Sequence, residues 1–205
     1  MSNPSIAWQR LQTGNRLCYA TGRAPKSAIA ADSHSPLAVV FGCADADFSS
    51  EVVLGQSGRS LINISNWGHM IDTGVLATVE YAVGTLKTPL IVVLGHQNCT
   101  AMHTALQAWN NATIPQGATR SVVEQAISSL TCHGATISNP DELAAAHVAQ
   151  TGVSLLEKSA VIAKAVDSGR CAIVCAVSAA DNGQLHTSAT FGDVAESSSP
   201  LLECV

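Results

Sequence analysis

The chain has 205 residues, a formal net charge of −5, and only 12% charged residues against 47% hydrophobic ones. The negative charge argues against nucleic acid or an anionic membrane as a partner, and polar residues interrupt every apolar run before it reaches the length of a membrane span. The length suits one domain over residues 1–205, and the low charge indicates a surface partly covered in an oligomer.

The N-terminal segment is expected to be a helix followed by an arm. Met1-Ser2-Asn3-Pro4 lacks the basic start and apolar stretch of a signal peptide, which predicts a cytoplasmic protein. Apolar residues at helical spacing predict a helix over residues 4–20. The small and polar residues 22–35 read as a connecting arm, and we expect residues 1–35 to pack on a partner subunit.

Short apolar runs rich in Val and Ile alternate with helical patterns along the rest of the chain, as is typical of buried parallel strands and their crossovers. The expected strands are residues 36–42, 61–64, 89–94 and 171–177, and the expected helices are 48–54, 72–86, 100–109, 119–130 and 141–166, the last broken near Gly152. Asp181-Asn182-Gly183 signals a hairpin, so residues 184–190 should pair antiparallel with the preceding strand. This order predicts an α/β fold: a mainly parallel central sheet flanked by helices, with an antiparallel C-terminal hairpin strand.

Two of the expected strands end in Gly and then in residues that bind metals. Strand 36–42 runs into Cys43, and strand 89–94 is followed by His96 and Cys99. Ligands of open α/β sheets bind beyond the carboxyl ends of the strands, so these side chains are expected to meet there. Two thiolates and an imidazole suit one Zn²⁺ ion per chain with a coordination position left open. The alternative is that the three residues begin unrelated loops.

The other cysteines carry no comparable pattern. Cys171 and Cys175 lie on one expected strand, where residues four apart are about 13 Å from each other. They cannot share a metal ion, and we interpret both as small core residues. Cys18, Cys132 and Cys204 have no partner that the sequence identifies.

The chain resembles the β-class carbonic anhydrases. That family carries C-x-D-x-R after its first strand and H-x-x-C after a later one, which correspond here to residues 43–47 and 96–99. The resemblance extends to the N-terminal helix over residues 8–22, to residues 68–76 and 80–83 before the second motif, and to the closing hairpin. It covers nearly the whole chain.

The resemblance implies a function and a set of roles. Cys43, His96 and Cys99 would bind zinc, and zinc-bound hydroxide would convert carbon dioxide reversibly to bicarbonate. Asp45 matches the motif aspartate, a catalytic residue that the family's arginine holds off the metal and orients toward the bound hydroxide. The expected assembly is a homodimer or a dimer of dimers.

The match fails at the motif arginine, whose position is taken by Asp47. Asp45 and Asp47 would form a like-charge pair near the metal, so we expect either that one of them binds the ion or that one holds a proton. Asp45 as a fourth ligand would give a closed Cys2HisAsp site without catalytic water. Thr100 stands where the family often has Gly, Trp67 brings bulk where small residues are usual, and Arg59 is a candidate to replace the missing partner of Asp45.

Four residues are expected in the substrate pocket: Gln56, Trp67, Gly68 and Tyr81. Gln56 matches a pocket glutamine, with a solvated loop residue as the alternative. Tyr81 matches an aromatic residue that the family often contributes across the dimer, with an ordinary helix-face residue as the alternative.

The histidines outside the two motifs are assigned lesser roles. His69 is expected to be a hydrogen-bonded structural residue rather than a proton relay, and His103 is a candidate for the surroundings of the metal. Four others carry no signal of a site: His34, His133, His147 and His186.

Several functions remain open at this point. The first is zinc-dependent hydration of carbon dioxide, or hydrolysis of an isostere such as carbonyl sulfide. The second is a non-catalytic zinc protein with a closed site. The third and weakest is a redox protein in which Cys43 and Cys99 form a disulfide.

Overall fold

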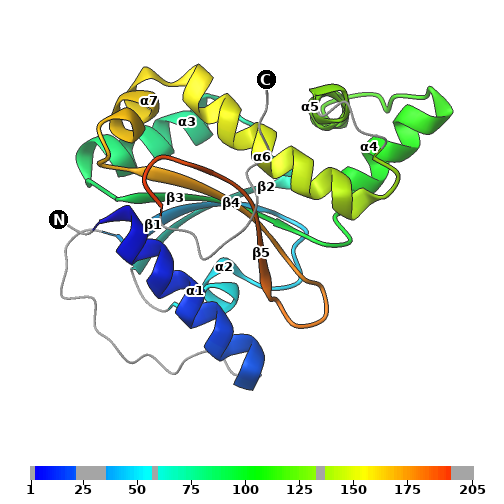
Figure 1. Cartoon of the computed structure of the whole chain (residues 1–205). Helices are drawn as coiled ribbons and strands as arrows, with labels where there is room; N and C mark the ends of the chain where they lie inside the picture. Colours follow the sequence, from blue (N-terminus) through cyan, green and yellow to red (C-terminus); the bar gives the residue numbers. More distant parts are fainter. Residues whose placement is uncertain (1–2, 22–35, 57–59, 133–136, 195–205) are drawn as a thin grey trace.

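A computed structural model describes residues 3–21, 36–56, 60–132 and 137–194. These residues form a five-stranded sheet with the strand order β2-β1-β3-β4-β5, covered by helices on both faces (Figure 1). The predicted arm over residues 22–35 and the candidate Arg59 lie outside the described residues.

The sheet is parallel except at one edge. Its strands are β1 (Ala38–Cys43), β2 (Leu61–Asn66), β3 (Leu90–His96), β4 (Ala172–Ser178) and β5 (Leu185–Phe191). Strands β2, β1, β3 and β4 pair in parallel, and β5 pairs antiparallel with β4. The predicted α/β class, its mainly parallel sheet and its C-terminal hairpin are therefore confirmed.

The helices follow the expected positions, except that the short helix η2 (Trp67–His69) was not predicted. They are α1 (Pro4–Thr21), α2 (Ser50–Val53), the short 3-10 helix η2 (Trp67–His69), α3 (Thr73–Glu80), the π-helical turn η3 (Tyr81–Thr85), α4 (Thr100–Asn111), α5 (Thr119–Cys132), α6 (Pro140–Lys158) and α7 (Ala160–Asp167). Side-chain caps explain where several begin: Asp72 accepts a hydrogen bond from the backbone N–H of Val75 at the start of α3, and Asn139 accepts two at the start of α6.

The predicted break near Gly152 is wrong. Helix α6 continues through Gly152, and the break before α7 falls at Ser159, which has an extended backbone and caps α7 by accepting from the N–H of Ile162. A Cβ atom on Gly152 would lie 2.6 Å from the sulfur of Cys175 and 2.7 Å from the ring of Phe191. The glycine therefore permits close packing of α6 on the sheet rather than interrupting the helix.

The two faces of the sheet build two hydrophobic cores, because successive side chains of a strand point to opposite faces. Val39, Phe41 and Ile91 belong to the core under α3, α6 and α7, whereas Val40 and Val92 face α1 and α2. Helices α4 and α5 pack together in a third cluster that includes Cys43 and Cys99. The strands β1, β3 and β4 are buried along their whole length, which holds their carboxyl ends in fixed register.

Helix α1 packs on the sheet of its own chain. Trp8 and Leu11 are fully buried in the core beneath it. Asn15 is also buried; its side chain donates to the carbonyls of Val53 and Gly183 and thereby ties α1 to α2 and to the hairpin turn. The prediction that residues 1–35 also contact a partner subunit stays a prediction.

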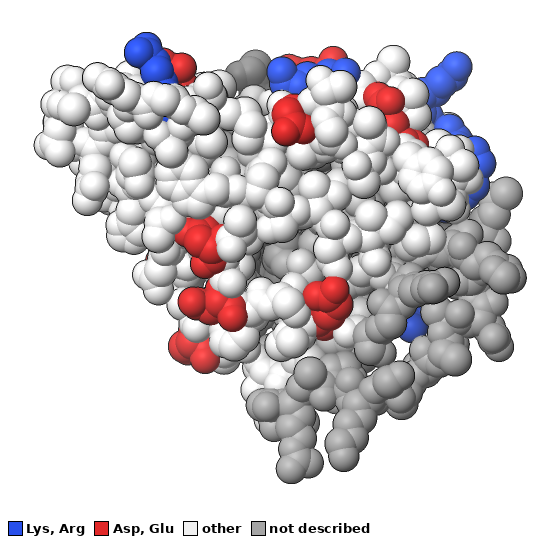
Figure 2. Space-filling view, turned by 180° about the vertical axis from the view of Figure 1, so that it is seen from behind, with Lys and Arg blue, Asp and Glu red and all other residues white. Residues whose placement is uncertain are grey.

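Charged side chains are sparse on the surface. On the face shown in Figure 2, the acidic residues form small separate groups with broad uncharged areas between them, in keeping with a charged content of 12%. Among the described helices, none combines the length and the apolar character needed to cross a membrane.

Candidate metal centre

Four side chains converge at the carboxyl ends of β1 and β3. Cys43 closes β1, Asp45 follows it, His96 closes β3 and Cys99 precedes α4. One ligand atom from each lies within 4.8 Å of the other three. Cys43, His96 and Cys99 are buried and Asp45 is half-buried. The structure thus brings together the three residues predicted to bind zinc and the aspartate predicted to assist them.

The spacing of the two sulfur atoms suits zinc. The Sγ atoms of Cys43 and Cys99 lie 3.8 Å apart. Two thiolates on a tetrahedral zinc ion, each at about 2.3 Å, would be about 3.8 Å from each other. The imidazole Nε2 atom of His96 completes a donor set of the kind that zinc prefers.

Asp45 points one oxygen at this cluster. Its Oδ1 atom lies 2.8 Å from Cys43 Sγ, 2.9 Å from His96 Nε2 and 3.8 Å from Cys99 Sγ. The first two distances are those of hydrogen bonds. The carboxylate therefore faces the position that a fourth ligand or a water molecule would take.

The second oxygen of Asp45 is held from outside the cluster. The backbone N–H and the hydroxyl of Thr100 both donate to Oδ2, at 2.8 and 2.5 Å. The indole N–H of Trp67 donates in turn to the Thr100 hydroxyl oxygen at 2.8 Å. In the sequence, Thr100 was noted only as a departure from the family pattern, and Trp67 both as a departure and as a candidate pocket residue.

The two aspartates of the motif lie in different surroundings. Asp47 is exposed, and the contacts to the cysteines, His96 and Thr100 belong to Asp45. Burial would raise the pKa of Asp45, but hydrogen bonds from Cys43, Thr100 and His96 outweigh it and hold that pKa below its ordinary value. These contacts favour the ionised form of Asp45, and the expectation that one of the two aspartates binds the ion or holds a proton stays a prediction.

The metal-free ligands hold protons that a metal ion would displace. The hydrogen bond with Cys99, together with burial, raises the pKa of the Cys43 thiol, and the same bond lowers the pKa of Cys99. Burial lowers the pKa of His96, but hydrogen bonds to Cys43 and Asp45 outweigh it and raise that pKa to about 9. Metal binding at this site would release protons, since zinc takes thiolates and neutral imidazole.

Backbone groups fix the ligands in place. The N–H of Gly68 lies 3.2 Å from the sulfur of Cys43 and donates to it. Gly68 has a φ of 71°, a left-handed conformation that favours glycine, and a Cβ atom there would lie 2.4 Å from Val122. The Nδ1 atom of His96 lies 2.9 Å from the carbonyl of Gln97, which leaves Nε2 facing the cluster.

The predicted pocket residues fall into two groups. Trp67 and Gly68 lie beside the cluster through the contacts described above. Gln56 is buried and donates to the carbonyl of Leu54, and Tyr81 is 53% exposed at the start of η3. The structure shows no contact between the last two and the cluster within the part of the chain that it describes.

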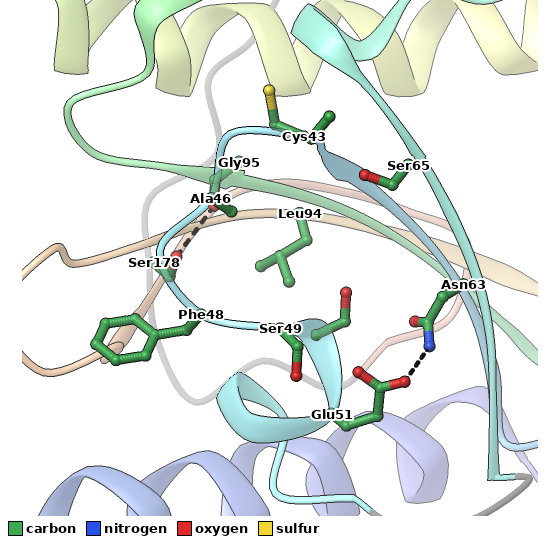
Figure 3. A pocket seen from close by; sticks show the side chains of 12 residues that line it. Cys43, Ala46, Phe48, Ser49, Glu51, Asn63, Ser65, Leu94, Gly95 and Ser178 are labelled. Atoms are coloured by element: carbon green, nitrogen blue, oxygen red, sulfur yellow. Dashed lines mark hydrogen bonds between the residues drawn. The ribbon is translucent and has the colours of Figure 1, made fainter.

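A cavity of about 310 Å³ opens next to the backbone of Cys43. Figure 3 shows Leu94 and Ser178 on one side of it and Glu51 and Asn63, which are hydrogen-bonded to each other, on another. The sulfur of Cys43 points away from this cavity in the same view. None of the four predicted pocket residues lines it.

Two buried histidines lie behind the cluster. His69 is hydrogen-bonded to the carbonyl of Leu94, which agrees with the structural role predicted for it. His147 in α6 contacts the carbonyl of Gly68 and the hydroxyl of Ser129, each at 3.0 Å. Sequence reasoning missed His147; its position four residues from the buried Leu143 on one helix face was the available signal. His103 is exposed on α4.

Comparisons with known proteins agree with this geometry. A family model described as carbonic anhydrase matches residues 38–185. The chain is 36% identical to carbonic anhydrase 2 of Mycobacterium tuberculosis over 203 residues, covering 95% of this chain and 98% of that one. It is 35% identical to the carbonic anhydrase of Mycolicibacterium smegmatis over 202 residues, with the same coverage.

Solved structures support the fold. A Coccomyxa β-carbonic anhydrase in complex with acetazolamide has a TM-score of 0.63 at 20% identity, covering 88% of this chain and 81% of that one. One of two tetrameric β-carbonic anhydrases from Sordaria macrospora has a TM-score of 0.64 at 19% identity, covering 76% of this chain and 81% of that one.

Proposed function

This chain belongs to the carbonic anhydrase family, and on that premise we propose that it catalyses the reversible, zinc-dependent hydration of carbon dioxide to bicarbonate. The observation that carries the proposal is the convergence of Cys43, His96 and Cys99 at the strand ends. It is supported by sequence identity to carbonic anhydrases along nearly the whole chain.

The residues of the site have distinct proposed roles. Cys43, His96 and Cys99 would hold one zinc ion per chain. The ion would act as a Lewis acid that lowers the pKa of a coordinated water to about 7. Asp45 would be the catalytic carboxylate: its Oδ1 atom is aimed at the cluster, and it would orient the nucleophilic oxygen. The N–H of Gly68 donates to the Cys43 sulfur and would stabilise the negative charge of a zinc-bound thiolate.

The complete pocket is proposed to include a second subunit. Gln56, Trp67, Gly68 and Tyr81 remain our candidates for it, and the exposure of Tyr81 leaves its ring available to a neighbouring chain. The Sordaria macrospora relatives are tetramers. We propose that this chain likewise forms a homodimer or a dimer of dimers. We also propose that it acts in the cytoplasm.

The second candidate function is a non-catalytic zinc protein, and the position of Asp45 favours it. Its Oδ1 atom already lies among the ligand atoms, so a Cys2HisAsp site would need little movement and would leave no place for water. In that case zinc would be retained and hydration would be absent.

The test is stopped-flow hydration of carbon dioxide on protein shown by elemental analysis to contain one zinc per chain. The pH is set above the value of about 7 expected for the coordinated water. A rate well above that of buffer supports the enzyme. If fully zinc-loaded protein accelerates neither the hydration of carbon dioxide nor the hydrolysis of carbonyl sulfide, the result supports the closed site instead.

A further inference from the structure

A chain of hydrogen bonds runs from the protein surface to the metal cluster. The indole N–H of Trp67 donates to the hydroxyl oxygen of Thr100, and that hydroxyl donates its own proton to Oδ2 of Asp45. A hydroxyl can accept and donate at once, so the two bonds are compatible and polarise each other in the same direction. The opposite oxygen of Asp45 faces Cys43 and His96.

The three residues come from separate elements. Trp67 opens η2 after β2, Thr100 is the first residue of α4, and Asp45 follows β1. Within the described part of the chain, the side chain of Thr100 therefore links the indole to the carboxylate. The position where the family motif has an arginine carries the exposed Asp47, which takes no part in this chain.

We infer that Trp67 and Thr100 are positioning residues that orient Asp45 toward the metal, in place of the arginine that the motif lacks. The two residues act through the carboxylate: the Thr100 hydroxyl donates to Asp45, and the Trp67 indole donates to Thr100. Removing a group that orients the surroundings of a metal in this way typically lowers the metal affinity or the activity of the protein by about 10- to 100-fold. The inference rests on the proposed zinc site.

The test compares zinc affinity, measured by competition with a chromogenic chelator, across four variants. Thr100→Val removes the hydroxyl and keeps the shape, and Thr100→Ser keeps the hydroxyl. Trp67→Phe removes the indole donor, and the double variant removes both. The matched controls are Thr113→Val and Trp109→Phe, which make the same changes at exposed positions near the end of α4.

We expect Thr100→Val to bind zinc about tenfold more weakly than the wild type. The loss should be no larger because the backbone N–H of Thr100 still donates to Asp45. Thr100→Ser should keep wild-type affinity, and Trp67→Phe should lose less than Thr100→Val. The double variant should lose no more than Thr100→Val, because both changes act along one path. Wild-type affinity in Thr100→Val, or additive losses in the double variant, would overturn the inference.

A second measurement separates this inference from the zinc proposal. In the metal-free protein, the indole N–H resonance of Trp67 is assigned by its absence in Trp67→Phe. It should shift upfield in Thr100→Val and stay in place in Thr113→Val. If the wild type binds no zinc, the proposed function fails, and the indole resonance still decides whether the hydrogen-bond chain exists. If the indole N–H resonance of Trp67 does not move in Thr100→Val, the inference is overturned.

Discussion

The sulfur atoms of Cys43 and Cys99 lie 3.8 Å apart although 56 positions separate the residues in the chain. Two buried thiols at the spacing of zinc ligands should both be required for binding. We expect Cys43→Ser and Cys99→Ser each to reduce bound zinc from one per chain to a small fraction. Elemental analysis of the purified variants measures this.

Cys132→Ser is the matched control, because Cys132 is exposed at the end of α5 and does not belong to the cluster. It should retain the zinc content of the wild type. Full zinc content in Cys99→Ser would contradict the assignment of the ligands.

Replacing Asp47 by Arg restores the charge of the family motif and should change little. Asp47 is exposed, and Oδ2 of Asp45 is already held by two hydrogen bonds from Thr100. Exposed substitutions usually change free energies by about 0.5 kcal/mol or less, which corresponds to about a twofold effect on rate. Stopped-flow hydration of carbon dioxide by the zinc-loaded variant measures the effect. If only Asp47→Arg is active, the wild-type site is closed because the motif arginine is absent.

Much of the fold was predictable because it follows from local patterns. Buried strands read as apolar runs, and Asp181-Asn182-Gly183 placed the hairpin before β5 correctly. The position of Cys43 and His96 after two such strands predicted their meeting, since parallel strands end at one edge of the sheet.

What could not be predicted depends on contacts between distant segments. Trp67 and Thr100 are 33 positions apart, and no periodicity shows that their side chains meet. Gly152 looked like a helix break because its tight contacts with Cys175 and Phe191 are formed only when α6 packs on the sheet. The helical spacing of His147 from Leu143 could indicate burial, but its partners could not be predicted because Gly68 and Ser129 lie on other elements.

The close contact at Gly152 predicts a loss of stability on adding one methyl group. In Gly152→Ala the new Cβ atom would lie 2.6 Å from Cys175 Sγ, so α6 or the sheet must shift. Overpacking of this kind costs about 1–3 kcal/mol of unfolding free energy, which urea unfolding measures. Gly84→Ala is the control, since its Cβ atom would meet Val161 at an ordinary 3.5 Å. Equal stabilities of the two variants would contradict the packing described for α6.

The buried histidines predict how stability depends on pH. Burial lowers the pKa of His147, and burial together with the neighbouring His147 lowers that of His69 from 6.5 to about 3. Both are therefore neutral in the folded protein at pH values where the unfolded chain takes up protons. Unfolding free energy should fall as the pH drops below about 6.5, by at most about 1.4 kcal/mol per pH unit for each histidine.

His147→Gln removes one of these groups and keeps a side-chain amide that can donate to the carbonyl of Gly68. We expect the variant to be less stable than the wild type at pH 7 but to lose stability less steeply between pH values of about 6.5 and 5, by up to about 1.4 kcal/mol per pH unit. Urea unfolding of the metal-free protein is the appropriate measurement, because zinc release would add its own proton uptake. His103→Gln, at an exposed position of α4, should keep the slope of the wild type. An unchanged slope in His147→Gln would mean that His147 takes up a proton in the folded protein as readily as in the unfolded chain, which would contradict the lowered pKa.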